Sequence, residues 1–295
     1  MADTQTQMLV TDFTTQLNQE AQQATSLFRG RILEDQVRGE IFEHQLLGAG
    51  NQKQVTSRFE DIVASSPEHQ RRGAIVKTFY DALYIDNDDQ LRSLVDIKSG
   101  YAKQMAMSAM RKLDKVVAEA AIGDILTGKN FTTTTGFAAD GVDVITAGSG
   151  LTYDKLREVK QTLNEKSVGL YGEQIYVAIT DVQASTLFDE IEVISSDYNR
   201  GEAARTGMLP QVLGMNLIVF PSAPVTGESI INKVSTVREC FAFAADGLKL
   251  GMLSDFNVRY ARREDKVDTN QLVITSRYAA LRTEGARVVK INVTE

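Results

Sequence analysis

One stretch limits what this chain can fold into more than any other: residues 99–129, which contain no proline and no glycine between Gly100 and Gly123. Small or apolar side chains recur along it at helical spacing, at Ala106, Met110, Leu113, Val117 and Ala120, with Ala109, Val116 and Ile122 beside them. Charged side chains fill the opposite side, at Arg111, Lys112, Asp114, Lys115 and Glu119. At about 1.5 Å per residue, the stretch predicts a helix roughly 40 Å long that acts as a strut.

The end of this stretch partly matches a phosphate-binding loop. Residues 123–129 (GDILTGK) fit the first seven positions of that motif, which is the basis for a nucleotide enzyme as a remote alternative. Asn130 stands where the motif needs Ser or Thr, and the motif requires a strand before it and a helix after it. We therefore interpret Gly128 as the left-handed cap of the long helix, with Lys129 near the negative end of the helix dipole.

Composition argues against several classes of function. Lysine and arginine number 32 against 39 acidic residues, so a net charge of −7 gives no support to binding nucleic acid by charge neutralisation. No apolar run approaches the length of a membrane span and no signal sequence begins the chain, so we expect a protein that folds in cytoplasm. The single cysteine, Cys240, lies in the apolar run ECFAFA and is predicted to be a buried, inert thiol.

Motifs that carry catalysis or bind metals are missing from the sequence. The two histidines, His44 and His69, stand in different contexts, and no paired-cysteine, His-Glu-x-x-His, nucleophile-elbow or dinucleotide pattern occurs. The acidic cluster at Asp86, Asp88 and Asp89 lacks the spacing of a calcium loop and is better explained as a helix N-terminus. Carboxylate catalysis stays open, but no pair is singled out. We expect no enzyme, no cofactor and no metal site.

The first part of the chain predicts an arm and a protruding hairpin. Residues 1–30 carry apolar side chains at the spacing of a weak amphipathic helix, at Met8, Phe13, Leu17, Ala21, Ala24 and Phe28. This helix is either an arm on a neighbouring molecule or a frayed terminus. A strand-like stretch from Val37 stops at residues 48–50, and residues 74–86 are predicted to return beside it as a second strand. The polar residues 51–73 between them predict a long, functional loop.

The later part of the chain predicts a compact α/β region followed by an antiparallel sheet. After a connector with a short strand at 142–145, Thr152 is expected to cap a helix that buries one face, at Leu156, Val159 and Leu163. Strands are predicted at 172–180 and 216–224, and a helix capped by Asp181 between them, running through Leu187, Phe188, Ile191 and Ile194. Residues 257–262, 271–281 and 286–293 predict an antiparallel meander with a turn at Glu284 and Gly285.

Arginine-rich segments flanked by acidic residues favour contact with another protein surface over phosphate binding. The two pairs are Arg71–Arg72, near Glu68, and Arg262–Arg263, before Glu264 and Asp265. With the polar loop, they supply the candidate inter-subunit contact residues Arg58, Glu60, Glu68, Arg71, Arg72, Arg262 and Arg263.

The ordered set of parts resembles the tailed-bacteriophage major capsid proteins of the Hong Kong 97 fold, an α+β fold. The resemblance covers nearly the whole chain, and the stretches that carry it are SRFEDIV, SSPEHQRRG, IDNDDQ, SGYAKQMAMSAMRKLD, LPQVLGMNLIVFPSAP and RTEGARVVKINV. It implies an N-terminal arm (1–36), strands with an extended loop (37–98, the loop at about 49–78), a spine helix (99–128), an axial domain (151–254) and a peripheral domain (129–150 with 255–295).

The resemblance also implies a function and a set of partners. It implies that copies of the chain form pentamers and hexamers, which assemble in the host bacterial cytoplasm into an icosahedral virion shell around double-stranded DNA, bound without sequence specificity. The implied partners are a portal protein, a decoration protein on some shells and, because the arm begins almost at Met1, a separate scaffolding protein. Non-covalent assembly is the expectation, although Lys53 and Lys77 lie in or near the loop. The alternative within the same fold is an encapsulin-like compartment.

Overall fold

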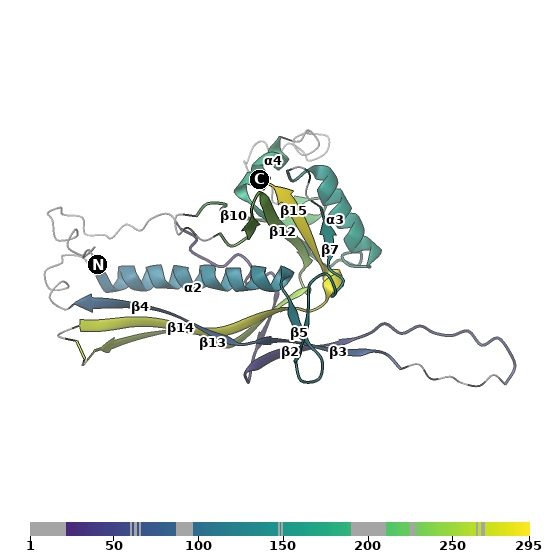
Figure 1. The fold of residues 1–295 in the computed structure, drawn as a ribbon, viewed down its shortest axis with the longest axis horizontal. Coiled ribbons are helices and arrows are strands. Elements are labelled where there is room, and N and C mark those ends of the chain that lie inside the picture. Colours follow the sequence, from purple (N-terminus) through teal and green to yellow (C-terminus); the bar gives the residue numbers. More distant parts are fainter. Residues whose placement is uncertain are drawn as a thin grey trace.

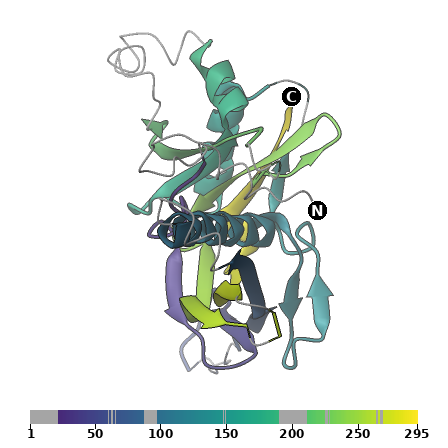
Figure 2. The ribbon, with the colours of Figure 1, turned by 90° about the vertical axis from the view of Figure 1, so that its left-hand side faces the viewer.

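A computed structural model describes residues 22–59, 61, 64, 66–86, 97–146, 148, 150–189, 211–224, 227, 229–263, 265, 266 and 269–295. The described residues form an elongated α+β subunit whose longest helix lies between two sheets (Figures 1 and 2). This helix, α2 (Ile97–Ile122), has 26 residues, and at about 1.5 Å per residue it is roughly 40 Å long. The predicted strut is therefore confirmed.

A four-stranded sheet follows α2 along its length. Its strands, in spatial order, are β1 (Leu33–Gln36), β13 (Leu248–Arg262), β14 (Thr269–Arg282) and β4 (Lys77–Asp86). The first pair is parallel and the others are antiparallel. Alternate side chains face α2, and Leu272, Ile274 and Ile85 are buried beneath it with Met105 of the helix. Figure 1 shows this sheet and α2 extending together to one side of the subunit.

A seven-stranded sheet forms the other lobe and contains most of the core. Its main path is β7 (Asp143–Ile145), β15 (Val288–Thr294), β12 (Val237–Ala244), β8 (Ile175–Thr180), β10 (Met215–Phe220) and β9 (Gln211–Val212), and β11 (Lys233–Val234) pairs with β12. All six residues of β8 are buried, as the apolar run predicted. The helices α3 (Tyr153–Glu165) and α4 (Asp181–Phe188) belong to this lobe. Thr152 caps α3 as predicted, since its side chain accepts a hydrogen bond from the Lys155 N–H.

A third sheet forms the base of the protruding hairpin. Its order is β2 (Ile41–Leu47), β3 (His69–Ile75), β5 (Ile125–Thr127) and β6 (Thr133–Thr135). The interpretation of residues 74–86 as the strand that returns beside the first is wrong, because β3 forms that pair and β4 pairs with β14 instead. Only Val76 separates β3 from β4, so the chain passes from one sheet to the next almost without interruption.

The long helix ends earlier than the predicted residue 128. Its last residue is Ile122, and Ile125–Thr127 form β5, whose Ile125 is buried. A β-branched, apolar residue fits a pleated, half-buried strand better than one more helical turn. Gly128 does have a positive φ of 90°, but it serves the turn between β5 and β6. The order of helix, strand and turn also removes the context that a phosphate-binding loop requires.

The last strand does not complete an antiparallel meander. The strands β13 and β14 pair as predicted, but β15 leaves their sheet through a short 3-10 helix, η2 (Gly285–Arg287), and pairs with β12 and β7. The connection from β12 to β13 also crosses between these two sheets, next to the connection from β14 to β15. Two hydrogen bonds join the two connections: the Thr283 N–H donates to the Gly247 carbonyl at 3.0 Å, and the Thr283 hydroxyl donates to the Asp246 carbonyl at 2.7 Å. These hydrogen bonds therefore fix the two crossings relative to each other.

Two further predictions of helices need correction. Residues 22–32 form turns and irregular backbone, so the predicted N-terminal amphipathic helix does not extend through them, and the part before residue 22 lies outside the described residues. The N-cap of α4 is Thr180 and not Asp181: the Thr180 N–H donates to Gln183 Oε1 at 3.0 Å, one half of a capping box. Ile191 and Ile194 lie outside the described residues, as do Asp88 and Asp89.

Candidate assembly surface

The protruding hairpin ends in a loop that exposes two large apolar side chains among its described residues. Its neck is closed by a hydrogen bond of 2.7 Å from the Gly48 N–H to the Glu68 carbonyl. Beyond that neck, Val55 is 75% exposed and Phe59 is 95% exposed. Figure 1 shows β2, β3 and the loop projecting away from the rest of the molecule. Two large apolar side chains exposed on a projecting loop are available for contact with another protein.

The tip of this loop has an unusual backbone conformation. Phe59 has φ of 69°, which is uncommon for a residue other than glycine. The guanidinium of Arg58 lies 5.9 Å from the centre of its ring, the outer limit of a cation–π contact. The tip therefore presents a basic group and an aromatic ring together, followed in sequence by the acidic residues Glu60 and Asp61.

A buried charge cluster holds the base of the hairpin. Arg72 of β3 binds Asp140 with two nitrogens, at 2.7 and 2.8 Å, and Arg282 of β14 donates to the same carboxylate at 2.8 Å. A second nitrogen of Arg282 donates to the carbonyls of Ala121 and Gly123, at 2.9 and 3.1 Å, and so satisfies the C-terminal end of α2. Burial lowers the pKa of Arg282, and Asp140 opposes that effect. One carboxylate thus joins the hairpin, the sheet and the helix.

A second buried carboxylate fastens the N-terminal segment to α2. Asp114, fully buried, accepts hydrogen bonds from the backbone N–H of Leu27 at 2.9 Å, from that of Phe28 at 3.4 Å and from the side chains of Ser26 and Gln23. Burial raises the pKa of Asp114, and these hydrogen bonds work against the increase. The prediction that Asp114 belongs to the solvent side of the helix is therefore wrong.

The contact with Asp114 places an aromatic side chain in the core. Phe28, fully buried, lies 5.1 Å from Phe220, 6.0 Å from Phe241 and 5.9 Å from Phe243, measured between ring centres. Residues 22–28 are thus part of the folded subunit. The predicted arm over residues 1–36 stays a prediction for the part before residue 22, which lies outside the described residues.

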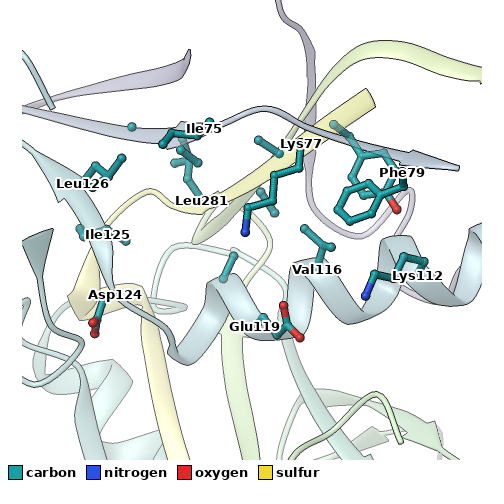
Figure 3. Close-up of a pocket in the computed structure, with 16 residues that line it drawn as sticks. Ile75, Lys77, Phe79, Lys112, Val116, Glu119, Asp124, Ile125, Leu126 and Leu281 are labelled. Atoms are coloured by element: carbon teal, nitrogen blue, oxygen red, sulfur yellow. The ribbon is translucent and has the colours of Figure 1, made fainter. Parts of the chain in front are cut away.

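A cavity of about 380 Å³ lies between α2, β14 and the junction of β3 with β4. Its apolar wall includes Ile75, Phe79, Val116 and Leu281, and Figure 3 shows Lys77 reaching from its strand towards the helix. Lys112, Glu119 and Asp124 add charge of both signs at the rim. Among the residues that the structure describes, none of these four charged side chains forms an ion pair. Lys112 lies 5.7 Å from the centre of the Phe79 ring, and Asp124 acts electrostatically on Arg282. The cavity therefore has a mixed lining of apolar and polar groups, and Lys77 and Glu119 are the charged side chains at its edge with no ion pair in the described residues.

The candidate contact residues do not form one cluster. Arg58 is exposed at the loop tip and Glu68 at the loop neck, whereas Glu60 lies outside the described residues. Arg71, at the hairpin base, pairs with Glu43 at 2.5 Å and is about one-third exposed. Arg262 and Arg263 lie at the far end of β13, at the opposite end of the molecule from the loop (Figure 1), where Arg263 binds Asp265 at 2.6 Å.

Arg72 needs a correction. Its side chain is 5% exposed and is bound to Asp140, so it serves the interior of the subunit and we leave it out of the candidate surface. Sequence reasoning also missed Asp114 and Asp140. A usable signal was present for Asp114, because Asp114, Ala118 and Ala121 recur at helical spacing and form a second buried stripe of small residues beside the apolar one. No local pattern marks Asp140.

Cys240 is buried as predicted, and we expect it to be unreactive in the folded subunit. Burial raises the pKa of its thiol to about 12, so the reactive thiolate is scarce at neutral pH. A thiol reagent should modify Cys240 at least about a hundredfold more slowly in the native chain than in the denatured chain, because the native thiolate is scarce and the reagent cannot reach the buried sulfur. A Tyr171→Cys variant, at a position that is 87% exposed, supplies the reactive control. Fast modification of the native chain would contradict the burial.

Other kinds of site find little support in the described part of the chain. No group of three or more His, Cys, Asp or Glu side chains there could hold a metal ion. Of the helices that the structure describes, none has the length and apolar character needed to cross a membrane.

Comparisons with known proteins find one family and a set of solved structures that share this fold. A family model described as phage capsid protein matches residues 5–295. No curated protein matches the chain. Among solved structures, the capsid of cyanophage P-SCSP1u has a TM-score of 0.73 at 13% identity, covering 98% of this chain and 94% of that one.

Two more solved structures show the same fold. The cyanophage Pam1 capsid has a TM-score of 0.71 at 11% identity, with 100% of this chain and 99% of that one covered. The capsid of a native GTA (gene transfer agent) particle has a TM-score of 0.69 at 11% identity, with 97% and 96% covered. The predicted Hong Kong 97-like α+β fold is thereby confirmed. Because the family model matches residues 5–295, nearly the whole chain, the chain belongs to the phage capsid protein family.

Proposed function

We propose that this chain is the major capsid subunit of a tailed phage, assembling through pentamers and hexamers into an icosahedral head that encloses double-stranded DNA. The observation that carries the proposal is the projecting loop with its uncovered Val55 and Phe59. A lone subunit leaves this apolar surface in water, and a neighbouring copy can bury it. Many such contacts, each weak, add up in a closed shell.

The proposed partners follow from this role. Copies of the chain meet through the loop and through the exposed candidates Arg58, Glu68 and Arg262 and the partly exposed Arg71 and Arg263. A scaffolding protein, a portal protein and, on some heads, a decoration protein complete the assembly in the host cytoplasm. A net charge of −7 supports packaged DNA that is enclosed by the shell and not gripped by it.

The family match supports the phage head over the encapsulin-like compartment and over the remote enzyme alternative. Electron microscopy of shells purified from an infected or induced host distinguishes the first two. Dense, ordered nucleic acid inside supports the phage head. Shells filled with a cargo enzyme would instead support the compartment.

Removing the loop should abolish assembly and leave the fold intact. We expect a chain in which a short Gly-Ser linker replaces residues 51–66 to stay folded, because this deletion spares β3, which begins at His69. It should form no closed shells under conditions in which the unaltered chain, with its scaffold, does. Velocity sedimentation and electron microscopy measure the shells, and circular dichroism checks the fold. Normal shells from the deleted chain would refute the assignment of the loop.

A further inference from the structure

The cavity between α2, β4 and β14 has the features of a receptor for one aromatic side chain. Its apolar lining is partly open to solvent: Ile75 is 50% exposed, and Phe79, Val116 and Leu126 are half-buried around the opening. A volume of about 380 Å³ leaves room for a phenyl ring. Aromatic anchors in apolar pockets that are rimmed by polar groups carry much of the affinity of protein interfaces.

The rim of the cavity indicates what should accompany that ring. Glu119 and Asp124 supply negative charge on one side, and both are exposed. Figure 3 shows Glu119 on the helix side and Lys77 extending from the strand that faces it. In the described residues, neither Glu119 nor Lys77 has an ion-pair partner. The preferred occupant is therefore an aromatic residue with a basic neighbour that reaches Glu119 and an acidic neighbour that reaches Lys77.

The loop tip of this chain has that composition. Arg58 lies beside the ring of Phe59, and Asp61 follows two residues later. Because Phe59 is 95% exposed, it does not fill the cavity of its own subunit. The ring and its charged neighbours are therefore available to the cavity of a second copy.

We propose that the cavity of one subunit receives Phe59 of a second copy, with Arg58 against Glu119 and Asp61 towards Lys77. This inference rests on the proposed function, since it requires subunits to assemble, and it specifies which surface receives the loop. It also gives the exposed Phe59 and the absence of ion pairs at Lys77 and Glu119 among the described residues a common explanation. The two halves of the contact lie on different parts of one subunit, so each copy can bind a neighbour on either side and the contact can close a ring.

Charge exchange tests the pairing of Arg58 with Glu119. We expect Arg58→Glu and Glu119→Arg each to lower the yield of shells about tenfold or more, because each places like charges together at a buried contact. The double variant should recover most of the yield. The matched control is Arg157→Glu, a reversal at a side chain on α3 that is 70% exposed, for which we expect little change. Melting temperatures of unassembled subunits should stay the same in all variants, since the altered side chains are exposed.

Disulfide trapping tests which chain fills the cavity. Ser57→Cys adds a thiol beside the loop tip without altering Arg58 or Phe59, and Ala120→Cys adds one to the cavity wall. The native Cys240 is buried, so it should not take part. Mild oxidation of shells that carry both substitutions should give ladders of linked chains on a non-reducing gel, and neither single variant should do so.

The outcomes separate this inference from the proposed function. If the unaltered chain forms no shells with any scaffold, the proposed function fails. If it forms shells but both charge reversals assemble normally and no ladder appears, this inference alone is overturned. A disulfide within one chain would assign the cavity to its own loop and overturn it as well. A further double variant carries Thr14→Cys with Ala120→Cys. If this variant forms the disulfide and the variant with Ser57→Cys and Ala120→Cys does not, the cavity is assigned to the N-terminal segment and this inference is overturned.

Discussion

Replacing Asp140 with alanine is expected to lower the free energy of unfolding of the subunit by about 3–5 kcal/mol, the cost of removing one partner from a buried ion pair. The change leaves Arg72 and Arg282 close together in the interior without a counter-charge. It also weakens the hold of Arg282 on the carbonyls at the end of α2. The hairpin base, the sheet and the helix should therefore all lose stability together.

Urea unfolding of unassembled subunits, followed by circular dichroism, measures this loss. The matched control is Asp154→Ala, which removes an exposed carboxylate that pairs with Arg157 and should cost no more than about 1 kcal/mol. If Asp140→Ala fails to fold, the soluble yields of the two variants still rank them. A transition midpoint for Asp140→Ala equal to that of Asp154→Ala would show that the cluster contributes nothing. Gly285→Ala tests the same charge cluster without removing a charge, because an added Cβ at residue 285 would collide with the backbone of Asp140. It should also lower the free energy of unfolding.

The second large effect is expected at Asp114. Alanine there leaves the buried N–H of Phe28 and the N–H of Leu27 without their acceptor, and each unsatisfied group costs about 1–3 kcal/mol. We expect residues 22–32 to leave the surface of α2 more often, while the sheets stay folded. Because Arg29 and Arg31 lie in this segment, trypsin should cut the variant there at least about tenfold faster than the unaltered chain, as local opening exposes the backbone.

Mass spectrometry of the early tryptic fragments identifies the cuts. Glu158→Ala, which removes an exposed carboxylate from α3, serves as the control and should leave the cleavage rate unchanged. An Asp114→Ala chain that resists trypsin as well as the control would show that Phe28 and its aromatic neighbours hold the segment without the carboxylate. Asp114→Asn should fall between the two, because an amide keeps one acceptor oxygen.

Features set by neighbouring residues could be predicted from the sequence. The cap at Thr152, the buried run of β8 and the helical spacing of α2 are local signals, and the structure agrees with each of them. The end of α2 is harder to predict because the same apolar residues suit a helix or a short strand. Pairing with β3 and β6, and not local propensity, makes residues 125–127 a strand.

The features that the sequence does not reveal depend on contacts between distant residues. Asp114 looks like any charged helical residue until a segment 86 to 91 positions away supplies its donors. Arg72 resembles a surface residue in the sequence because its partner Asp140 stands 68 positions further along the chain. The loop is predictable from its polarity and length, but its predicted end at residue 73 is wrong because β3 begins at His69 and pairs with β2. The cavity is built from separate strands and a helix, so only the structure shows it.

The neighbouring crossings between the two large sheets have a mechanical consequence. The chain passes from one sheet to the other at residues 244–248 and again at residues 282–288, and hydrogen bonds from Thr283 tie these passages together. Two adjacent crossings form a joint: they make bending about the line that joins them easier than twisting, and the packing of α2 and the shared core against both sheets limits the range of that bending. If one chain is to fit rings of five and of six subunits, we expect the change in curvature to be absorbed as bending at this joint, with each sheet moving as a stiff plate.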